Sequence, residues 1–292
     1  MKLLLTGKNG QVGFELQRTL AVLGEVIAID WEDCDLANAS EIRRVVRAIS
    51  PNVIVNPAAY TAVDKAESDP SLAHAINAHA PGVLAEEAEN LGALLVHYST
   101  DYVFDGTKDG AYLESDVPKP SSVYGETKLA GERAVIASCS RHLILRTSWV
   151  VGAHGSNFAK TMLRLAAERD TLSVVADQFG APTSAALLAD LTSHLVRQAQ
   201  HTDFPYGLYH AVAAGETNWH AYACHVIERA RAAGKHVRAA PDAIKAITTS
   251  EYPTPARRPA NSRLDTSLLR ETFGLHLPEW KMGVDHILDQ IL

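Results

Sequence analysis

Cysteine is scarce in this chain: among its 292 residues there are only three, Cys34, Cys139 and Cys224, and no two of them are close in sequence. This scarcity excludes a disulfide framework and a Cys-x-x-Cys metal clip. The first residues also lack the long apolar core and the cleavage site of a secretory signal. We therefore expect the chain to work in a reducing compartment, the cytoplasm.

Long apolar runs and a surplus of basic residues are also missing. No stretch approaches about 18 uninterrupted apolar residues, which predicts that nothing spans a membrane. The formal net charge is −7, whereas a dedicated nucleic-acid binder needs a net basic face. With 47% hydrophobic and 21% charged residues, the composition is that of a folded globular protein, and the length is typical of two lobes.

The regular alternation of short apolar runs with helical patterns indicates the fold. It predicts an α/β class, a Rossmann-type doubly wound parallel sheet with helices on both faces. We expect the hydroxyl of Ser40 to cap the second helix and Pro81 to kink or divide the third. The predicted strands are residues 2–6, 26–30, 52–56, 93–98 and 142–146, and the predicted helices are residues 11–23, 40–49, 71–91 and 122–138.

Three glycines, Gly7, Gly10 and Gly13, lie between the first predicted strand and the first predicted helix. Such a loop gives a tight turn, lets the backbone approach a pyrophosphate, and directs the N–H groups of a helix N-terminus at it. Asp30 follows Gly7 by 23 residues, near the spacing at which a carboxylate meets the adenosine ribose. The sequence therefore predicts a dinucleotide cofactor.

The charges around this loop leave the choice between NADPH and NADH open. Asp30 favours NADH, because a carboxylate repels a 2′-phosphate. Lys8 lies in the loop itself, however, and Arg18 lies on the following turns of the helix. Either cation would attract the 2′-phosphate of NADPH.

Beyond about residue 148 the alternation becomes less regular. We expect an NAD(P)-binding Rossmann domain over residues 1–148 and a smaller C-terminal α/β lobe over residues 149–292 that mainly binds substrate. Some segments of this lobe are expected to return to the first domain. Helical patterns cover residues 157–168, 183–200 and 219–232, a strand-like run covers 207–211, and a segment rich in proline and arginine covers 252–261.

Tyr124 and Lys128 are four residues apart at the start of a predicted helix, which puts both side chains on one face. They follow the fourth strand, which ends near Thr100, and ligand crevices open at the C-terminal ends of such strands. A lysine ammonium about 5 Å away, at an effective dielectric constant of about 20, stabilises a tyrosinate by roughly 3 kcal/mol. That effect predicts a Tyr124 pKa lowered from about 10 to roughly 7.5. Such a group suits a general acid that protonates the alkoxide formed on carbonyl reduction, with Thr100 hydrogen-bonded to the same oxygen.

These residues carry a resemblance to a known family. The glycine loop, Thr100, Tyr124 and Lys128 resemble the extended short-chain dehydrogenase/reductases. Longer strings, spread over essentially the whole chain, resemble more narrowly the dTDP-4-dehydrorhamnose reductases. These strings are NPAAYTAVDKAES (56–68), HYSTDYVFDG (97–106), YGETKLAGE (124–132), RTSWVVG (146–152), NFAKTML (157–163), DQFGAPT (177–183) and YPTPARRPANSRLD (252–265).

The resemblance implies an activity and a role for single residues. Members of the family reduce the C4 keto group of dTDP-6-deoxy-L-lyxo-4-hexulose with NAD(P)H to give dTDP-L-rhamnose, the final step of that pathway. Tyr124 is then implied as the proton donor, Lys128 as the residue that lowers its pKa and holds the nicotinamide ribose, and Thr100 as a residue that tunes the site. The cofactor contacts implied are Gly10, Gln11 and Val12 at the pyrophosphate, Asp30 at the adenosine ribose, Asp35 and Leu36 at the adenine, and Ala59, Tyr60 and Thr61 beside the nicotinamide; the sugar contacts implied are Thr100, Asp101 and Trp149.

Three arginines of the proline-rich segment, Arg257, Arg258 and Arg263, are candidates for a clamp on the substrate diphosphate, because guanidinium geometry suits phosphate. The alternative is that they belong to a solvated loop. The sequence does not decide which of them would reach the diphosphate, and Arg257 is taken as the candidate.

No metal site is expected. Some members of the family dimerise through magnesium held by three glutamates. Glu15 matches the first of these, but Ala186 and Gln290 stand at the other two positions. Because Mg²⁺ needs carboxylate oxygens, we expect a monomer or a weak homodimer rather than a metal-linked dimer.

Other functions remain open at this point. A nucleotide-sugar 4,6-dehydratase is disfavoured, since it needs a second carboxylate where this chain has Tyr102. A reductase or an epimerase of another nucleotide-4-keto-sugar would use the same catalytic residues. A non-catalytic NADP-binding regulatory subunit, like that of methionine adenosyltransferase, would bind the cofactor and a partner without turnover.

Overall fold

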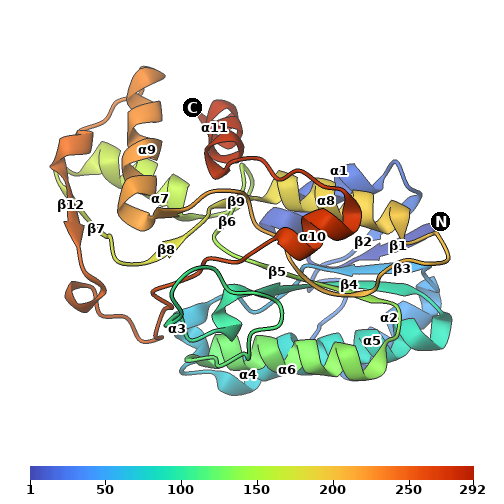
Figure 1. Cartoon of the computed structure of the whole chain (residues 1–292). Coiled ribbons are helices and arrows are strands. Elements are labelled where there is room, and N and C mark those ends of the chain that lie inside the picture. The colour runs from blue at the N-terminus through green and yellow to red at the C-terminus, as the bar shows by residue number, and fades with distance from the viewer.

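A six-stranded parallel sheet forms the centre of the molecule. The computed structural model describes residues 1–292, and Figure 1 shows the sheet with helices on both faces. The predicted α/β class and parallel sheet are confirmed. Across the sheet, the strands follow one another in the order β10 (Gly207–His210), β5 (His142–Thr147), β4 (Leu94–Thr100), β3 (Val53–Asn56), β1 (Lys2–Leu5) and β2 (Glu25–Ala28).

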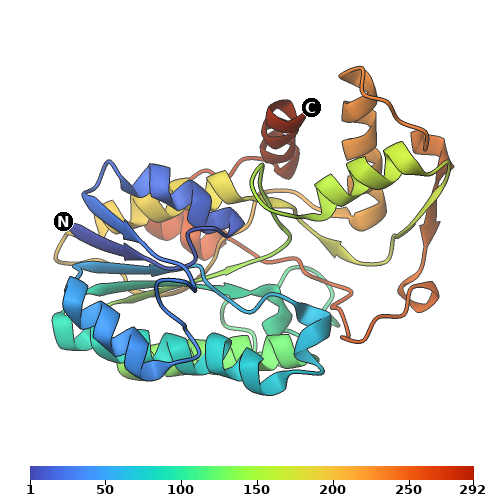
Figure 2. The same ribbon diagram turned by 180° about the vertical axis from the view of Figure 1, so that it is seen from behind.

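Each face of the sheet is covered because the strands are apolar on both sides, as buried parallel strands are. Leu3 and Leu5 of β1 pack with Leu16 of helix α1 on one face, and Leu4 packs with Ile42 of helix α2 on the other. Figures 1 and 2 show the two layers from opposite sides. The first layer holds α1 (Gln11–Leu20), α8 (Ala185–Gln198) and α10 (Ser267–Phe273), and the second holds α2 (Ala39–Ile49), α5 (Ala80–Leu91) and α6 (Val123–Ser138).

The direction in which the chain crosses the sheet changes at β1. From β1 the chain goes to β2 on one side, and then to β3, β4 and β5 on the other. The crevice beyond the carboxyl ends of β1 and β3 is therefore the topological switch point. Open α/β sheets bind their ligands at such a point.

The segments after β5 build a second group of helices and short strands, with a core of its own around Tyr222 and Trp280. Not all of the later chain belongs to it, because β10, α8 and α10 lie on the central sheet. The functional division at residue 148 remains a prediction. The second group holds α7 (Phe158–Glu168), α9 (Trp219–Ala232), α11 (Trp280–Ile291) and three strand pairs, β7 (Leu172–Val175) with β12 (Ile244–Ile247), β8 (Phe179–Gly180) with β11 (Thr217–Asn218), and β6 (Val150–Val151) with β9 (Thr183–Ser184).

Two local predictions need correction. The cap of α2 is Asn38, whose side chain accepts from the N–H groups of Ser40 and Glu41, so the expected Ser40 cap is wrong. The helical stretch before β4 divides into α3 (Val63–Ala66), α4 (Pro70–His74) and α5, and a π-helical turn (Ala75–His79) joins α4 to α5. Pro81 lies in the first turn of α5, and the backbone is helical at His79 and Ala80 just before it, so the helix is not divided at Pro81. No helix in the structure is both long enough and apolar enough to cross a bilayer.

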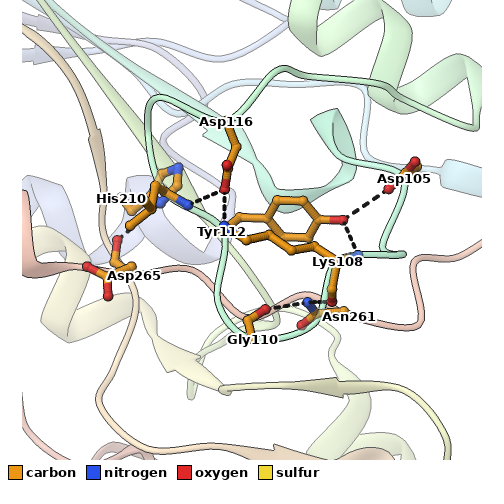
Figure 3. Close-up of polar contacts among 9 residues, drawn as sticks. Asp105, Lys108, Gly110, Tyr112, Asp116, His210, Asn261 and Asp265 are labelled. Atoms are coloured by element: carbon orange, nitrogen blue, oxygen red, sulfur yellow. Dashed lines mark hydrogen bonds and ion pairs between the residues drawn. The ribbon is translucent and has the colours of Figure 1, made fainter.

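The loop after β4 is attached to the C-terminal segment by side-chain contacts (Figure 3). The Tyr112 hydroxyl donates to Asp105 at 3.0 Å and accepts from the Lys108 backbone N–H at 3.1 Å. The side-chain amide of Asn261 donates to the carbonyls of Lys108 and Gly110, at 2.8 and 2.7 Å. The proline-rich segment that contains Asn261 is thereby fixed to the loop that begins at the end of β4.

Candidate active site

A cavity of about 480 Å³ opens at the switch point, between the loop after β1 and the loop after β3. Gly7 has a positive φ of 63°, which favours glycine. A Cβ on Gly13 would lie 2.0 Å from the carbonyl oxygen of Gly7, so the tight turn and the close backbone approach both depend on glycine. The residues present therefore fit a dinucleotide pyrophosphate. The cavity is lined by the predicted residues Gly7, Gly10, Gln11, Val12, Gly13, Asp30, Ala59, Thr61, Tyr124 and Lys128.

The end of this cavity at which the sequence predicts the adenosine is acidic. The carboxylate of Asp30 accepts from the backbone N–H groups of Asn9 and Trp31, at 2.9 and 2.8 Å. Lys8 is held by Asp33 at 2.6 Å, whereas Arg18 pairs with Glu15 and Asp190 and so faces α8 instead of the loop. A smaller adjoining cavity of about 160 Å³ is lined by Trp31, Asp35 and Leu36, among others.

The end of the cavity at which the nicotinamide is expected is bordered by the loop after β3. Ala59 and Thr61 line the cavity, whereas Tyr60 does not. The backbone of Tyr60 is instead clamped by Asn77, whose side chain accepts from the Tyr60 N–H at 2.9 Å and donates to its carbonyl at 3.1 Å. Asn77 belongs to the π-helical turn and also donates to the Thr127 hydroxyl of α6. Such turns are frequent at functional sites, and this one fixes the loop at the cavity.

Tyr124 lies where the cavity meets the end of β4, on the first turn of α6, which Ser122 caps. Burial and the nearby charge of Asp101 raise the pKa of Tyr124 to about 12, against a smaller lowering effect of the Thr100 hydroxyl. Thr100 donates to Asp101 at 3.0 Å. Burial also raises the pKa of Asp101 to about 6, although contacts with the hydroxyls of Ser262 and Thr100 lower it.

Lys128 is buried on the same face of α6 and also lines the cavity. Its ammonium donates to the carbonyl of Tyr98 at 2.6 Å and lies 3.4 Å from Nε2 of His97. Burial lowers its pKa to about 8, and the charge of Glu132 opposes that shift. The prediction that Lys128 brings the pKa of Tyr124 close to neutrality is wrong in this structure. Burial and the charge of Asp101 have the largest effects on the pKa of Tyr124, and the Lys128 ammonium donates to the Tyr98 carbonyl.

Trp149 follows β5 and stacks on Trp219, with ring centroids 3.7 Å apart and planes 18° apart. Its backbone has a φ of 49°, in the left-handed region that bulky residues rarely adopt. Gly180 permits this arrangement, since a Cβ there would lie 2.9 Å from the Trp149 ring. Strained residues held by their surroundings cluster at ligand sites.

The three arginines differ in their partners. Arg258 forms two hydrogen bonds with the carboxylate of Asp64, the shorter at 2.8 Å. Arg263 pairs with Glu216 at 3.2 Å. Arg257 is exposed and forms no ion pair, and it lines a third cavity of about 450 Å³ beside the exposed ring of Tyr252.

Comparison with known proteins decides the family. A family model described as "RmlD substrate binding domain" matches residues 1–292. The dTDP-4-dehydrorhamnose reductase of Escherichia coli K12 is 52% identical over 295 residues, which cover 100% of this chain and 98% of that protein. The chain belongs to the dTDP-4-dehydrorhamnose reductase family.

Solved structures of the family agree with the fold. The crystal structure of a dTDP-4-dehydrorhamnose reductase from Clostridium acetobutylicum has a TM-score of 0.93 and 38% identity, covering 100% of this chain and 99% of that one. The enzyme of the same name from Bacillus anthracis, solved in complex with NADP, has a TM-score of 0.90 and 36% identity, covering 99% of each chain. The predicted family resemblance is confirmed.

At the three positions considered for magnesium above, the chain has Glu15, Ala186 and Gln290. Glu15 pairs with Arg18 at 3.6 Å. No group of three or more His, Cys, Asp or Glu side chains in the structure is placed to hold a metal ion. Oligomeric state and freedom from metal remain predictions.

Sequence reasoning missed several residues that hold the site together in this family member. Asn77, His97 and Trp219 contact the predicted residues Tyr60, Lys128 and Trp149 respectively. A signal existed for the first two, since a buried polar side chain in an otherwise apolar helix or strand normally has a partner. For Trp219 there was none, because the stack joins segments far apart in the sequence.

Proposed function

We propose that this chain reduces the C4 ketone of dTDP-6-deoxy-L-lyxo-4-hexulose, with NADH or NADPH, to dTDP-L-rhamnose. The observation that carries the proposal is the placement of Tyr124 and Lys128 in the wall of the dinucleotide cavity, next to Thr100 and Asp101 at the end of β4. Family membership supplies the substrate. The same family supports a reductase rather than a regulatory subunit.

Tyr124 is the proton donor in this proposal. A bound nicotinamide supplies a hydride to C4, which leaves a developing alkoxide on the former ketone oxygen. With its raised pKa, Tyr124 keeps its proton until that charge develops. The alkoxide is more basic than a phenolate, so the proton still moves from Tyr124 to the sugar oxygen.

Lys128 and Thr100 support this transfer. The buried ammonium of Lys128 stabilises the phenolate that Tyr124 becomes, which lowers the barrier only as charge develops. Thr100 directs its single hydroxyl proton at Asp101 in the structure. We propose that it turns this proton to the ketone oxygen when the sugar binds.

Three side chains are assigned to contacts with the rest of the substrate, which are the sugar ring, a sugar hydroxyl and the diphosphate. Trp149 offers the sugar a flat apolar face, held rigid by Trp219, and Asp101 accepts from a sugar hydroxyl. Arg257, without an ionic partner of its own, is assigned to the diphosphate, because Arg258 and Arg263 are already paired with carboxylates. Guanidinium groups bind phosphate in two-donor geometry.

We also propose that the chain works in the cytoplasm as a monomer or weak homodimer. Its three cysteines are free, and two of them are buried, which fits a reducing compartment. Loss of two of the three magnesium ligands removes the basis for a metal-linked dimer.

The test is a reaction of the purified chain with dTDP-6-deoxy-L-lyxo-4-hexulose, following nicotinamide absorbance with NADH and with NADPH. We expect dTDP-L-rhamnose as the product, identified by chromatography against the C4 epimer. Tyr124→Phe is expected to lower kcat by roughly 10²–10⁴-fold while cofactor affinity is kept. Tight cofactor binding with no turnover by the wild-type chain would refute the proposal.

A further inference from the structure

Behind Lys128 lies a row of buried polar side chains that the proposed reaction does not use. Three of them, Thr6 directly after β1, Asn56 of β3 and His97 of β4, are each no more than 1% exposed. The Thr6 hydroxyl donates to the Asn56 side chain at 2.6 Å, the Asn56 amide lies 3.1 Å from Nδ1 of His97, and Nε2 of His97 lies 3.4 Å from the ammonium of Lys128. The row crosses three neighbouring strands and ends at the catalytic lysine.

The chemistry of these groups fixes the state of the ring. An ammonium has donors only, so Nε2 of His97 has to accept and its ring proton has to sit on Nδ1. The Asn56 backbone carbonyl is the acceptor for that proton, since the side-chain amide nitrogen of Asn56 near Nδ1 has donors only. Burial and the charge of Lys128 hold the pKa of His97 well below its usual range, which is consistent with a neutral ring.

Few other groups can hold the Lys128 ammonium. The Tyr98 carbonyl accepts one of its protons at 2.6 Å. Glu132, one turn further along the same helix, is engaged by Arg146 of β5 at 2.7 Å and by Ser99 of β4. Asp101, beyond the end of β4, acts by its charge on Tyr124, and no carboxylate forms an ion pair with Lys128.

We propose that His97 is a positioning residue for the reductase reaction: its neutral ring presents Nε2 as the acceptor that keeps Lys128 charged and directed into the cofactor cavity. The Asn56 backbone carbonyl holds the ring in this tautomer. The inference rests on the proposed function, in which the charged form of Lys128 stabilises the Tyr124 phenolate. It assigns a chemical task to His97, the first residue of the string HYSTD, three positions before Thr100.

Two substitutions of His97 distinguish the role of Nε2 from that of Nδ1. His97→Gln places an amide oxygen near the Nε2 position and keeps an acceptor for Lys128. The shorter side chain of His97→Asn reaches only the Nδ1 position, so the Lys128 ammonium loses this acceptor. Losing a hydrogen bond to a charged group lowers the lysine pKa by about one unit.

The decisive measurement is the pH profile of kcat for the wild-type chain and both variants. Activity falls as pH rises through the pKa of Lys128. For His97→Asn we expect this fall of kcat to begin about one pH unit lower than in the wild type. The variant's kcat is then about fivefold below that of the wild type at pH 8 and nearly equal to it at pH 6. His97→Gln should follow the wild type closely. Equal, pH-independent losses in both variants, or an unshifted fall of kcat in His97→Asn, would overturn the inference.

A second measurement does not need the sugar. In the chain labelled with ¹⁵N-histidine, the ring signals of His97, identified by their loss in His97→Gln, are expected to report a neutral ring protonated on Nδ1. In a pH titration, the chemical shifts of these signals should change as the pH passes through the pKa of Lys128. The substitution Lys128→Met should abolish this change. A ring protonated on Nε2 at pH 7 would contradict the inference whatever the substrate. If the wild-type chain turns over no sugar while these signals behave as expected, the proposed function fails and the placement of the proton stands.

Discussion

The hydroxyl of Thr100 donates to Oδ1 of Asp101 at 3.0 Å, while Oδ2 of the same carboxyl is buried without any partner. A buried carboxylate with one unpaired oxygen is costly to ionise, and the pKa of Asp101 is raised to about 6 accordingly. Between about pH 4 and 6 the folded chain therefore binds more protons than the unfolded chain. The free energy of unfolding falls as pH rises through this window.

Asp101→Asn should remove this cost while keeping an acceptor for Thr100. At pH 7.5 we expect the free energy of unfolding to rise by about 2 kcal/mol, since a shift of about two pKa units corresponds to somewhat more than that. At pH 4 the gain should vanish, because Asp101 is then neutral. Urea denaturation at both pH values measures the difference, with the exposed Asp109→Asn as control. Equal free energies of unfolding for the variant and the wild type at pH 7.5 would refute the prediction. The turnover of Asp101→Asn is expected to be lower than that of the wild type.

Gly13→Ala tests the glycine loop. Its new Cβ would lie 2.0 Å from the Gly7 carbonyl oxygen, so either the turn or the first residues of α1 must shift. Overpacking of this kind costs about 1–3 kcal/mol, and we expect NADH affinity to fall by at least tenfold. Titration of cofactor fluorescence measures this loss. Gly152→Ala is the matched control, because a Cβ there meets only ordinary contacts of 3.4 Å or more; a similar loss in both variants would argue against the steric explanation.

Arg257→Gln tests the diphosphate contact. A lost charged hydrogen bond predicts a KM for the dTDP-sugar about tenfold higher, with kcat nearly unchanged because the contact is the same in the ground state and the transition state. The penalty should shrink as salt is added, since Arg257 is exposed. Steady-state kinetics at two salt concentrations checks this. Arg231→Gln, an exposed residue of α9, should leave KM unaltered, and an unchanged KM in Arg257→Gln would remove Arg257 from the site.

Trp219→Leu tests the aromatic support of Trp149. Stacked pairs contribute about 0.5–1.5 kcal/mol beyond their buried area, so KM for the sugar is expected to rise about fivefold while cofactor affinity is kept. The near-ultraviolet circular dichroism signal of the stacked pair should disappear with it. Phe158→Leu removes a tilted neighbour of Trp219 and leaves the stack itself. If both variants raise KM equally, the stack has no particular role.

Much of the fold follows from the sequence, because each buried strand is a short apolar run between helical patterns, and the observed strands lie within two residues of the predicted ends. The location of the cavity follows too, from Gly7 to Gly13 between the first strand and the first helix. What the sequence could not supply is the direction in which Lys128 points. The Tyr98 carbonyl and Nε2 of His97 both lie within reach of its ammonium, and only the folded positions of these two groups show that they hold it.

The order of strands in the sheet has a consequence for how the chain is made. Leu188 and Leu195 of α8 pack in the same core as Leu16 of α1, and β10 completes the sheet beside β5. During synthesis at about 5–20 residues per second, the apolar face of α1 emerges on the order of ten seconds before α8 does. The nascent nucleotide-binding half therefore exposes an apolar surface that is prone to aggregate until residues near 210 leave the ribosome. A truncation placed before β10 would make that temporary exposure permanent.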